Sequence, residues 1–195
     1  MAAVFEVSIS FKEVLPFEVV FDTLDMAQLP YTISSIEVMD NWEYENLRSL
    51  DIETTGANTL TDYVRNNNII TLRGFINNNQ CGFSSELISC NANLVEAWIS
   101  LEHLEFLDTD HISHCNSEVY ELITNIIVKL SEHHQVDYCA IGVETYLSYQ
   151  KHIDAIIEDS NNVNRWIISD KQQPGIAAGF STTKKNDFVI LSREK

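Results

Sequence analysis

The strongest constraint on the fold is the alternation of apolar and polar residues near the start of the chain, in the segment FEVSISFK at residues 5–12. Its apolar residues occupy every second position, at Phe5, Val7, Ile9 and Phe11. Every second side chain of a β-strand points to the same face, so the segment predicts a strand with one buried face and one solvated polar face. Such a strand is typical of an antiparallel sheet or a sheet edge, and not of the interior of a parallel sheet.

Further segments have the length and the apolar or β-branched content of strands. They are residues 31–39, 69–76, 84–90, 136–144, 166–170 and 187–194. The segment 94–107 fits a helix and a strand about equally well, because its apolar residues match both periods. The β-branched residues Val95 and Ile99, together with the turn-forming residues 91–93, favour a strand.

Four segments predict helices, at residues 16–30, 59–66, 116–134 and 145–159. Pro16 suits the first helical position of the first segment, and Pro30 ends it. In the third segment the predicted buried stripe is Val119, Leu122, Ile123, Ile126 and Leu130. In the fourth it is Tyr146, Tyr149, Gln150, Ile153, Ile156 and Ile157.

Together these elements predict a single α+β domain over residues 1–195. It would contain a mostly antiparallel or mixed sheet of about seven or eight strands, with about four helices packed mainly on one face. A chain of 195 residues is long enough to bury a substantial core, and it contains no internal repeat or long linker. A two-half arrangement with a break near residues 77–92 is the alternative.

The charge of the chain is its most unusual property. The 29 acidic and 12 basic residues give a net charge of −17, and residues 1–163 alone hold 26 acidic and 6 basic residues, a net of −20. Such a field repels nucleic acid and anionic membranes, and it attracts basic proteins. Acidity also keeps a protein soluble, and that explanation stays open.

The compartment follows from the N-terminus and the cysteines. The first residues have no basic region of the kind that opens a signal peptide, and no apolar run is long enough to span a bilayer. The four cysteines show no CxxC pair, so they are expected to be reduced and to pack as small apolar residues. We therefore expect a cytoplasmic protein.

Two acidic segments are candidates for a partner-binding surface. The first contains Asp40, Trp42, Glu43, Tyr44 and Glu45, and the second contains Glu102 and Glu105. Aromatic residues beside carboxylates are the composition that a binder of a basic protein would present. If the second segment continues a strand with its apolar residues inward, Glu96 and Glu102 share its outward face.

A metal site is a second possibility, in the segment LDTDHISHC at residues 107–115. Its candidate ligands are Asp108, Asp110, His111 and His114. Carboxylate and imidazole groups bind zinc, manganese or iron. The same composition is also typical of an acidic loop before a helix N-terminus, where carboxylates favour the helix dipole.

No GxGxxG, P-loop, GxSxG or kinase signature occurs in the sequence, so no cofactor and no catalytic residue is predicted. In overall character the chain resembles bacterial toxin-immunity proteins, which shield a cell from a basic toxin that is often a nuclease. That resemblance lies in the acidity and in the lack of catalytic motifs. It implies binding to a basic, nuclease-type protein toxin. The negative charge of the chain separately predicts that neither nucleic acid nor a membrane is a partner. The alternatives are a metal-dependent hydrolase centred on residues 108–114 and a regulatory subunit of a larger assembly.

Overall fold

The computed structural model describes residues 4–26, 31–76, 79–88, 92–100, 117–147, 152–172, 174–175 and 178–194. Within these ranges the strands are β1 (Val4–Phe11), β2 (Tyr31–Met39), β3 (Arg48–Leu50), β4 (Ile69–Ile76), β5 (Asn79–Leu87), β6 (Asn93–Ser100), β7 (Val136–Tyr146), β8 (Asn161–Ser169), β9 (Phe180–Lys185) and β10 (Phe188–Arg193). The helices are α1 (Phe17–Met26), α2 (Ala57–Arg65), α3 (Ser117–Leu130), α4 (Ile153–Asp159) and the short 3-10 helix η1 (Asp170–Gln172).

The strands of the described residues form one sheet in the order β3-β2-β4-β5-β6-β1-β7-β8-β10-β9. Each neighbouring pair is antiparallel. The predicted α+β class and the antiparallel sheet are therefore confirmed, and 93–100 is a strand as the β-branched residues favoured. The division of the chain into one domain or two stays a prediction.

The number of strands was predicted wrongly, because the sheet has ten strands and not seven or eight. The two missed strands are β3 and β9, which form its two edges. β3 has only three residues, and β9 has the mostly exposed sequence FSTTKK, which contains no apolar alternation. β9 is specified instead by a hairpin with β10, through the two-residue turn at Asn186 and Asp187. Asn186 adopts a φ of 51°, a left-handed conformation that asparagine tolerates.

Strand β1 lies in the middle of the sheet, between β6 and β7, and not at an edge. Its apolar face is the predicted one: Phe5 and Phe11 are buried, and Val7 and Ile9 pack against the same core. The opposite face is polar but not solvated, because Ser8 and Ser10 are each only 2% exposed. A polar face in the middle of a ten-stranded sheet is covered by neighbouring side chains in a way that an edge strand's face is not.

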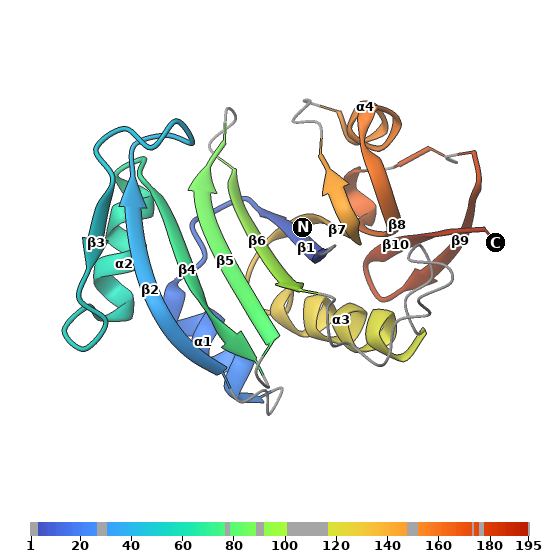
Figure 1. The fold of residues 1–195 in the computed structure, drawn as a ribbon. Helices are drawn as coiled ribbons and strands as arrows, with labels where there is room; N and C mark the ends of the chain where they lie inside the picture. Colours follow the sequence, from blue (N-terminus) through green and yellow to red (C-terminus); the bar gives the residue numbers. More distant parts are fainter. Residues whose placement is uncertain are drawn as a thin grey trace.

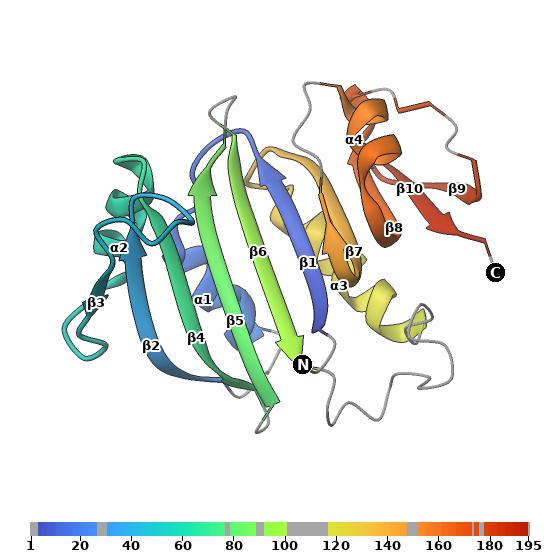
Figure 2. The same cartoon turned by 45° about the horizontal axis from the view of Figure 1, so that its top comes forward.

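Three helices cover one face of the sheet. The apolar side of β1 and β7 packs with Tyr120 and Ile127 of α3. Further along the same face, Phe17 of α1 and Leu60 of α2 pack on β2 and β4. The backbone N–H of Phe17 donates a 3.0 Å hydrogen bond to the Thr61 hydroxyl, which ties α1 to α2. Figures 1 and 2 show these three helices behind the sheet.

Helix α4 packs on the opposite face, at the C-terminal end of the sheet. Its residues Ile153, Ile156 and Ile157 are buried in a cluster with Trp166 and Ile168 of β8. Among the described elements, α4 leaves the polar face of β2, β4, β5, β6 and β1 uncovered (Figure 2). This part of the sheet is called the open face below.

The buried side of α3 matches the predicted stripe only in part, since Val119, Ile123 and Leu130 pack against the core as predicted. Leu122 was expected to be buried but is 50% exposed, and Tyr120, Thr124 and Ile127 are buried instead. Tyr120 packs edge-on against Phe5 at 6.1 Å between ring centroids. A helix with apolar residues at adjacent positions can bury either of two stripes, and the sheet selects one of them.

Helix α4 is shorter than predicted, because its first predicted residues belong to β7. Tyr146, which was expected on the buried side of the helix, ends that strand and is 65% exposed. The register of β7 and β8 shifts between Gly142 and Tyr146, and Glu144 adopts a φ of 48°. The prediction for Tyr149 and Gln150 lies outside the described residues. No helix within the described ranges has the length and apolar content that crossing a membrane would require.

Candidate functional site

Two rows of side chains run across the open face, each strand contributing one residue to each row. The first row comprises Glu37, Thr71, Ser84, Glu96 and Ser8, in the order of the strands. The second row comprises Ser35, Arg73, Gly82, Trp98 and Glu6. Directly opposed residues of antiparallel strands lie close enough to interact, so these rows bring together groups that are far apart in the sequence.

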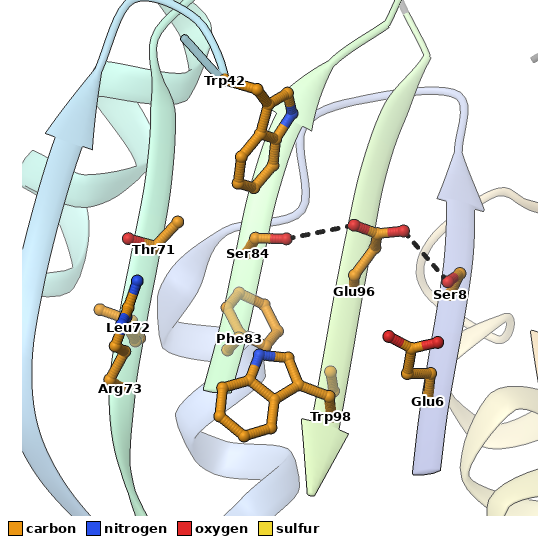
Figure 3. Close-up of a pocket in the computed structure, with 11 residues that line it drawn as sticks. Glu6, Ser8, Trp42, Thr71, Leu72, Arg73, Phe83, Ser84, Glu96 and Trp98 are labelled. Atoms are coloured by element: carbon orange, nitrogen blue, oxygen red, sulfur yellow. Dashed lines mark hydrogen bonds between the residues drawn. The ribbon is translucent and has the colours of Figure 1, made fainter. Parts of the chain in front are cut away.

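A pocket of about 270 Å³ lies along the two rows. Its polar lining is Glu6, Ser8, Thr71, Arg73, Ser84 and Glu96, and its aromatic lining includes Trp42 and Trp98. Figure 3 shows the Trp42 indole at one end of the pocket and the Trp98 indole at the other, with Ser84 and Glu96 between them. Small side chains form the floor and two large indoles form the ends, which is why the surface is hollow there.

Glu96 is the central carboxylate of the pocket. Its two oxygens accept hydrogen bonds from the Ser8 hydroxyl at 3.3 Å and the Ser84 hydroxyl at 3.5 Å. Burial raises the pKa of Glu96, and repulsion from Glu86 and Glu6 raises this pKa further, while the bonds from the two serines oppose the rise. The pocket therefore holds a carboxylate that is poorly compensated by its surroundings.

Glu6 lies beside Glu96 on the neighbouring strand β1. Its carboxylate accepts hydrogen bonds from β7, which lies on the other side of β1 from Glu96. One of its oxygens accepts hydrogen bonds from the backbone N–H of Thr145 and from the Thr145 hydroxyl, the latter at 2.9 Å. Arg73 is the cation of the pocket lining, and its guanidinium lies 3.9 Å from Glu37 on β2. Trp98 separates Arg73 from Glu6 (Figure 3). None of the ion pairs within the described residues involves Glu6, Glu86 or Glu96.

Trp42 joins the pocket to the loop between β2 and β3. Its indole N–H donates a 3.0 Å hydrogen bond to the Glu86 carboxylate of β5. Burial raises the pKa of Glu86, and this indole bond acts in the opposite direction. The ring is still 46% exposed. It is therefore fixed in position by one polar contact while much of its surface is free to meet a partner.

The loop of residues 40–47 is held by its own side chains. Asn41 accepts hydrogen bonds from the backbone N–H groups of Glu43 and Glu45, and its amide donates to the Glu45 carboxylate at 2.9 Å. Asp40 accepts a 2.6 Å bond from Asn46 and a 2.9 Å bond from Asn68, which anchors the loop to the start of β4. Such local bonds define one loop conformation.

The backbone of this loop contains two left-handed residues that are not glycine. Tyr44 adopts a φ of 63° and Asn46 a φ of 52°. This conformation is tolerated by asparagine but strained for a tyrosine. The strained residue is also exposed, since 55% of the Tyr44 surface is accessible. The loop therefore presents an aromatic side chain on its exposed surface.

The first predicted partner-binding segment thus lies beside the pocket. Trp42 lines it, and Tyr44, Glu43 and Glu45 lie on the exposed surface of the same loop. Asp40 has a structural part in the loop, because both its oxygens accept hydrogen bonds. Whether these residues bind a partner stays a prediction.

Other predicted site residues lie outside the described residues. These are Glu102, Glu105, Asp108, Asp110, His111 and His114. Their proposed roles stay predictions. Across the part of the chain that the structure does describe, no group of three or more His, Cys, Asp or Glu side chains is placed to hold a metal ion.

The sequence prediction missed most of the pocket. It placed Glu96 on the outward face of its strand, which the open face confirms, but it did not select Glu96 as a site residue. It also missed Glu6, Trp98 and Arg73. A usable signal was present: polar residues alternating with apolar ones in several predicted strands imply a polar sheet face. The missing information was which strands are neighbours.

The described cysteines are Cys81 and Cys139, and neither forms a disulfide bond in the structure. Cys139 is fully buried, and this burial raises the pKa of its thiol, so it packs as a small apolar residue. Cys81 is partly buried, and its pKa is also raised. Cys90 and Cys115 lie outside the described residues.

In the comparisons with known proteins, neither a protein-family model, nor a curated protein, nor a solved structure matches this chain.

Proposed function

We propose that this chain is a protein-binding module that docks and neutralises a basic partner in the bacterial cytoplasm, in the manner of a toxin-immunity protein. The observation that carries the proposal is the loop of residues 40–47, which holds Trp42 and Tyr44 exposed among carboxylates. Exposed aromatic residues in fixed positions are frequent centres of binding energy at protein interfaces. Because the loop is already ordered, less conformational entropy is lost when a partner binds.

The distribution of charge supports a basic partner. The net charge of −17 creates a field that a basic protein would feel before contact. Glu43 and Glu45 are exposed beside the two aromatic residues, and Glu86 and Glu96 lie just beneath. Charge of this kind increases the association rate, whereas buried aromatic contacts set the dissociation rate.

The first experiment isolates the natural partner and measures its binding rates against salt. The neighbouring reading frame provides the first candidate, and a pull-down from the native host provides others. Association should slow markedly as the screening length falls from roughly 30 Å at 0.01 M to about 10 Å at 0.1 M ionic strength. Dissociation should change much less. An acidic partner, or an association rate that is indifferent to salt, contradicts the proposal.

Matched variants locate the surface. The double charge reversal Glu43→Lys with Glu45→Lys should slow association about tenfold or more at low salt. The control reverses Glu158 and Asp159 of α4, which changes the net charge equally at an exposed site away from the loop. Trp42→Ala should instead speed dissociation by about thirtyfold, the effect of losing roughly 2 kcal/mol at an interface centre. Equal effects of the two reversals would place the binding surface elsewhere.

A further inference from the structure

The open-face pocket combines the three kinds of group that hold an arginine side chain: an aromatic face, a carboxylate and hydroxyl acceptors. Trp98 and Trp42 supply the aromatic faces, Glu96 supplies the carboxylate, and Ser8 and Ser84 supply the hydroxyls. A planar guanidinium stacks on an indole while its N–H groups reach several acceptors at once. An ammonium group has no planar face to stack.

The chain itself contains such an arrangement with the arginine present. The guanidinium of Arg165 lies over the Tyr120 ring at 5.1 Å from its centroid. The same group donates a 2.8 Å hydrogen bond to Glu121 and a 3.1 Å hydrogen bond to the Thr124 hydroxyl. The set is therefore one aromatic ring, one carboxylate and one hydroxyl, gathered around one guanidinium.

The open-face pocket has the same set of groups but no cation between them. Glu96 has only hydroxyl partners among the described residues, and Glu86 has only the Trp42 indole. The guanidinium of Arg73 lies 3.9 Å from Glu37, and strand β5 with Ser84 lies between Arg73 and Glu96 (Figure 3). Buried carboxylates are ordinarily paired with a cation or with several donors, so the pocket has an uncompensated negative charge.

The size of the pocket suits one side chain. Its volume of about 270 Å³ is slightly smaller than the roughly 300–1,000 Å³ of pockets that enclose a drug-sized ligand. The partly exposed Trp42 of the loop lines the pocket, so a protein docked on that loop could insert a side chain without moving the sheet.

We propose that the open-face pocket receives an arginine side chain of the basic partner, with its guanidinium between the Trp98 and Trp42 indoles and paired with Glu96. This inference rests on the proposed function, because it takes the occupant from that partner. It adds the chemical group that the pocket recognises. An inserted arginine, with its single positive charge, would neutralise Glu96 and remove the repulsion between Glu96 and Glu86.

The test uses small probes and needs no partner. Nα-acetyl-arginine N-methylamide is titrated into the full chain at constant ionic strength, and the tryptophan indole N–H resonances are followed by NMR. Millimolar affinity is expected for a single side chain. The resonances of Trp42 and Trp98 should shift, whereas that of Trp166, which is 1% exposed in the α4 cluster, should not. The matching citrulline compound has the same shape without the charge and should give no shift.

Variants connect the response to the carboxylates. Glu96→Gln keeps the shape of the side chain and should weaken binding of the arginine probe roughly tenfold or more, as expected when a charge-assisted bond is lost. Glu86→Gln should weaken it less, and Glu158→Gln in α4 should not change it. Unshifted Trp166 resonances in each variant show that the fold is retained.

Several results would overturn the inference: equal shifts with the citrulline compound, a stronger response to Nα-acetyl-lysine N-methylamide, an undiminished response in Glu96→Gln, or no shift at all. These results leave the proposed function standing if the whole partner still binds with salt-dependent kinetics. Conversely, the arginine probe could bind as expected while the natural partner proves acidic. That result would refute the proposed function, and the partner could then not be the protein that supplies the arginine.

Discussion

The indole of Trp98 lies directly against the backbone of Gly82 on the neighbouring strand. A Cβ atom at position 82 would approach Cε2 and Nε1 of that indole to 2.3 Å. Real contacts of a Cβ atom are never that short, so the absence of a side chain at residue 82 is what lets the Trp98 ring lie flat along the pocket. The position of the ring therefore depends on a glycine sixteen residues earlier in the chain.

Gly82→Ala should displace the Trp98 ring and open one end of the pocket. We expect a loss of about 1–3 kcal/mol of unfolding free energy, which is typical of overpacking, measured by denaturant unfolding. The Trp98 indole resonance should shift, and binding of the arginine probe should weaken. Gly56→Ala is the control, since a Cβ there would meet nothing within 4 Å. An unchanged Trp98 resonance in Gly82→Ala would contradict the close packing of the Trp98 indole on Gly82.

Glu96→Gln should stabilise the protein at neutral pH. A carboxyl group whose pKa is raised on folding binds its proton more tightly in the folded state, so the ionised group destabilises the fold. This destabilisation begins as pH rises above the ordinary glutamate value of 4.5 and is complete above the raised value of Glu96. The melting temperature of Glu96→Gln should therefore exceed that of the native protein at pH 7, and the difference should shrink toward pH 4.

The control for this pH dependence is Glu158→Gln, which alters an exposed carboxylate in α4. Its melting temperature should follow that of the native protein at each pH. Glu86 contributes in the same direction as Glu96, because burial raises its pKa as well. A Glu96→Gln variant that is less stable than the native protein at pH 7 would show that the pocket carboxylate is well compensated.

Asn41→Ala should loosen the loop of residues 40–47 with little effect on global stability. The change removes the acceptor of the Glu43 and Glu45 backbone N–H groups, whose bonds are 3.0 Å and 3.4 Å long. Because the loop is exposed, we expect a loss of about 1 kcal/mol or less. Partner dissociation should accelerate, since the loop must then be ordered on binding. Asn58→Ala, at an exposed position of α2, should leave dissociation unchanged.

Arg165→Ala should be strongly destabilising, because this arginine joins α3 to β8. Its side chain is only 14% exposed and pairs with Glu121. Loss of the stacking on Tyr120 and of the charged hydrogen bonds predicts a decrease of about 2–4 kcal/mol. Arg65→Ala breaks an exposed pair with Asp62 and should cost about 0.5 kcal/mol or less. If urea unfolding showed similar losses of unfolding free energy in the two variants, the structural role of Arg165 between α3 and β8 would be refuted.

The metal hypothesis for Asp108, Asp110, His111 and His114 is tested by elemental analysis. If these residues bind a metal, protein purified without chelator should contain near-stoichiometric zinc, manganese or iron. The double variant His111→Ala with His114→Ala should then lose it. Background metal in the native protein, or the same content in both proteins, rejects the hypothesis.

Most of the elements could be predicted from the sequence, because their signals are local. The strands at residues 31–39 and 69–76 were placed with the bounds that the structure shows. Where two local signals competed, the tertiary structure decided. Tyr146 fits a helical stripe, yet the pairing of β7 with β8 draws it into the sheet. Leu122 fits a buried stripe, yet Tyr120 and Ile127 fit the sheet better.

The sequence by itself determined which residues of each strand share a face, because alternation is a property of one strand's own backbone. It determined the acidity of the chain in the same direct way. It did not determine which strands are neighbours. Ser8 and Glu96 are 88 residues apart and meet only because β1 pairs with β6. Strand order and register depend on hydrogen bonds and core packing between distant segments, so the tertiary structure alone decided that polar residues from four strands form one pocket.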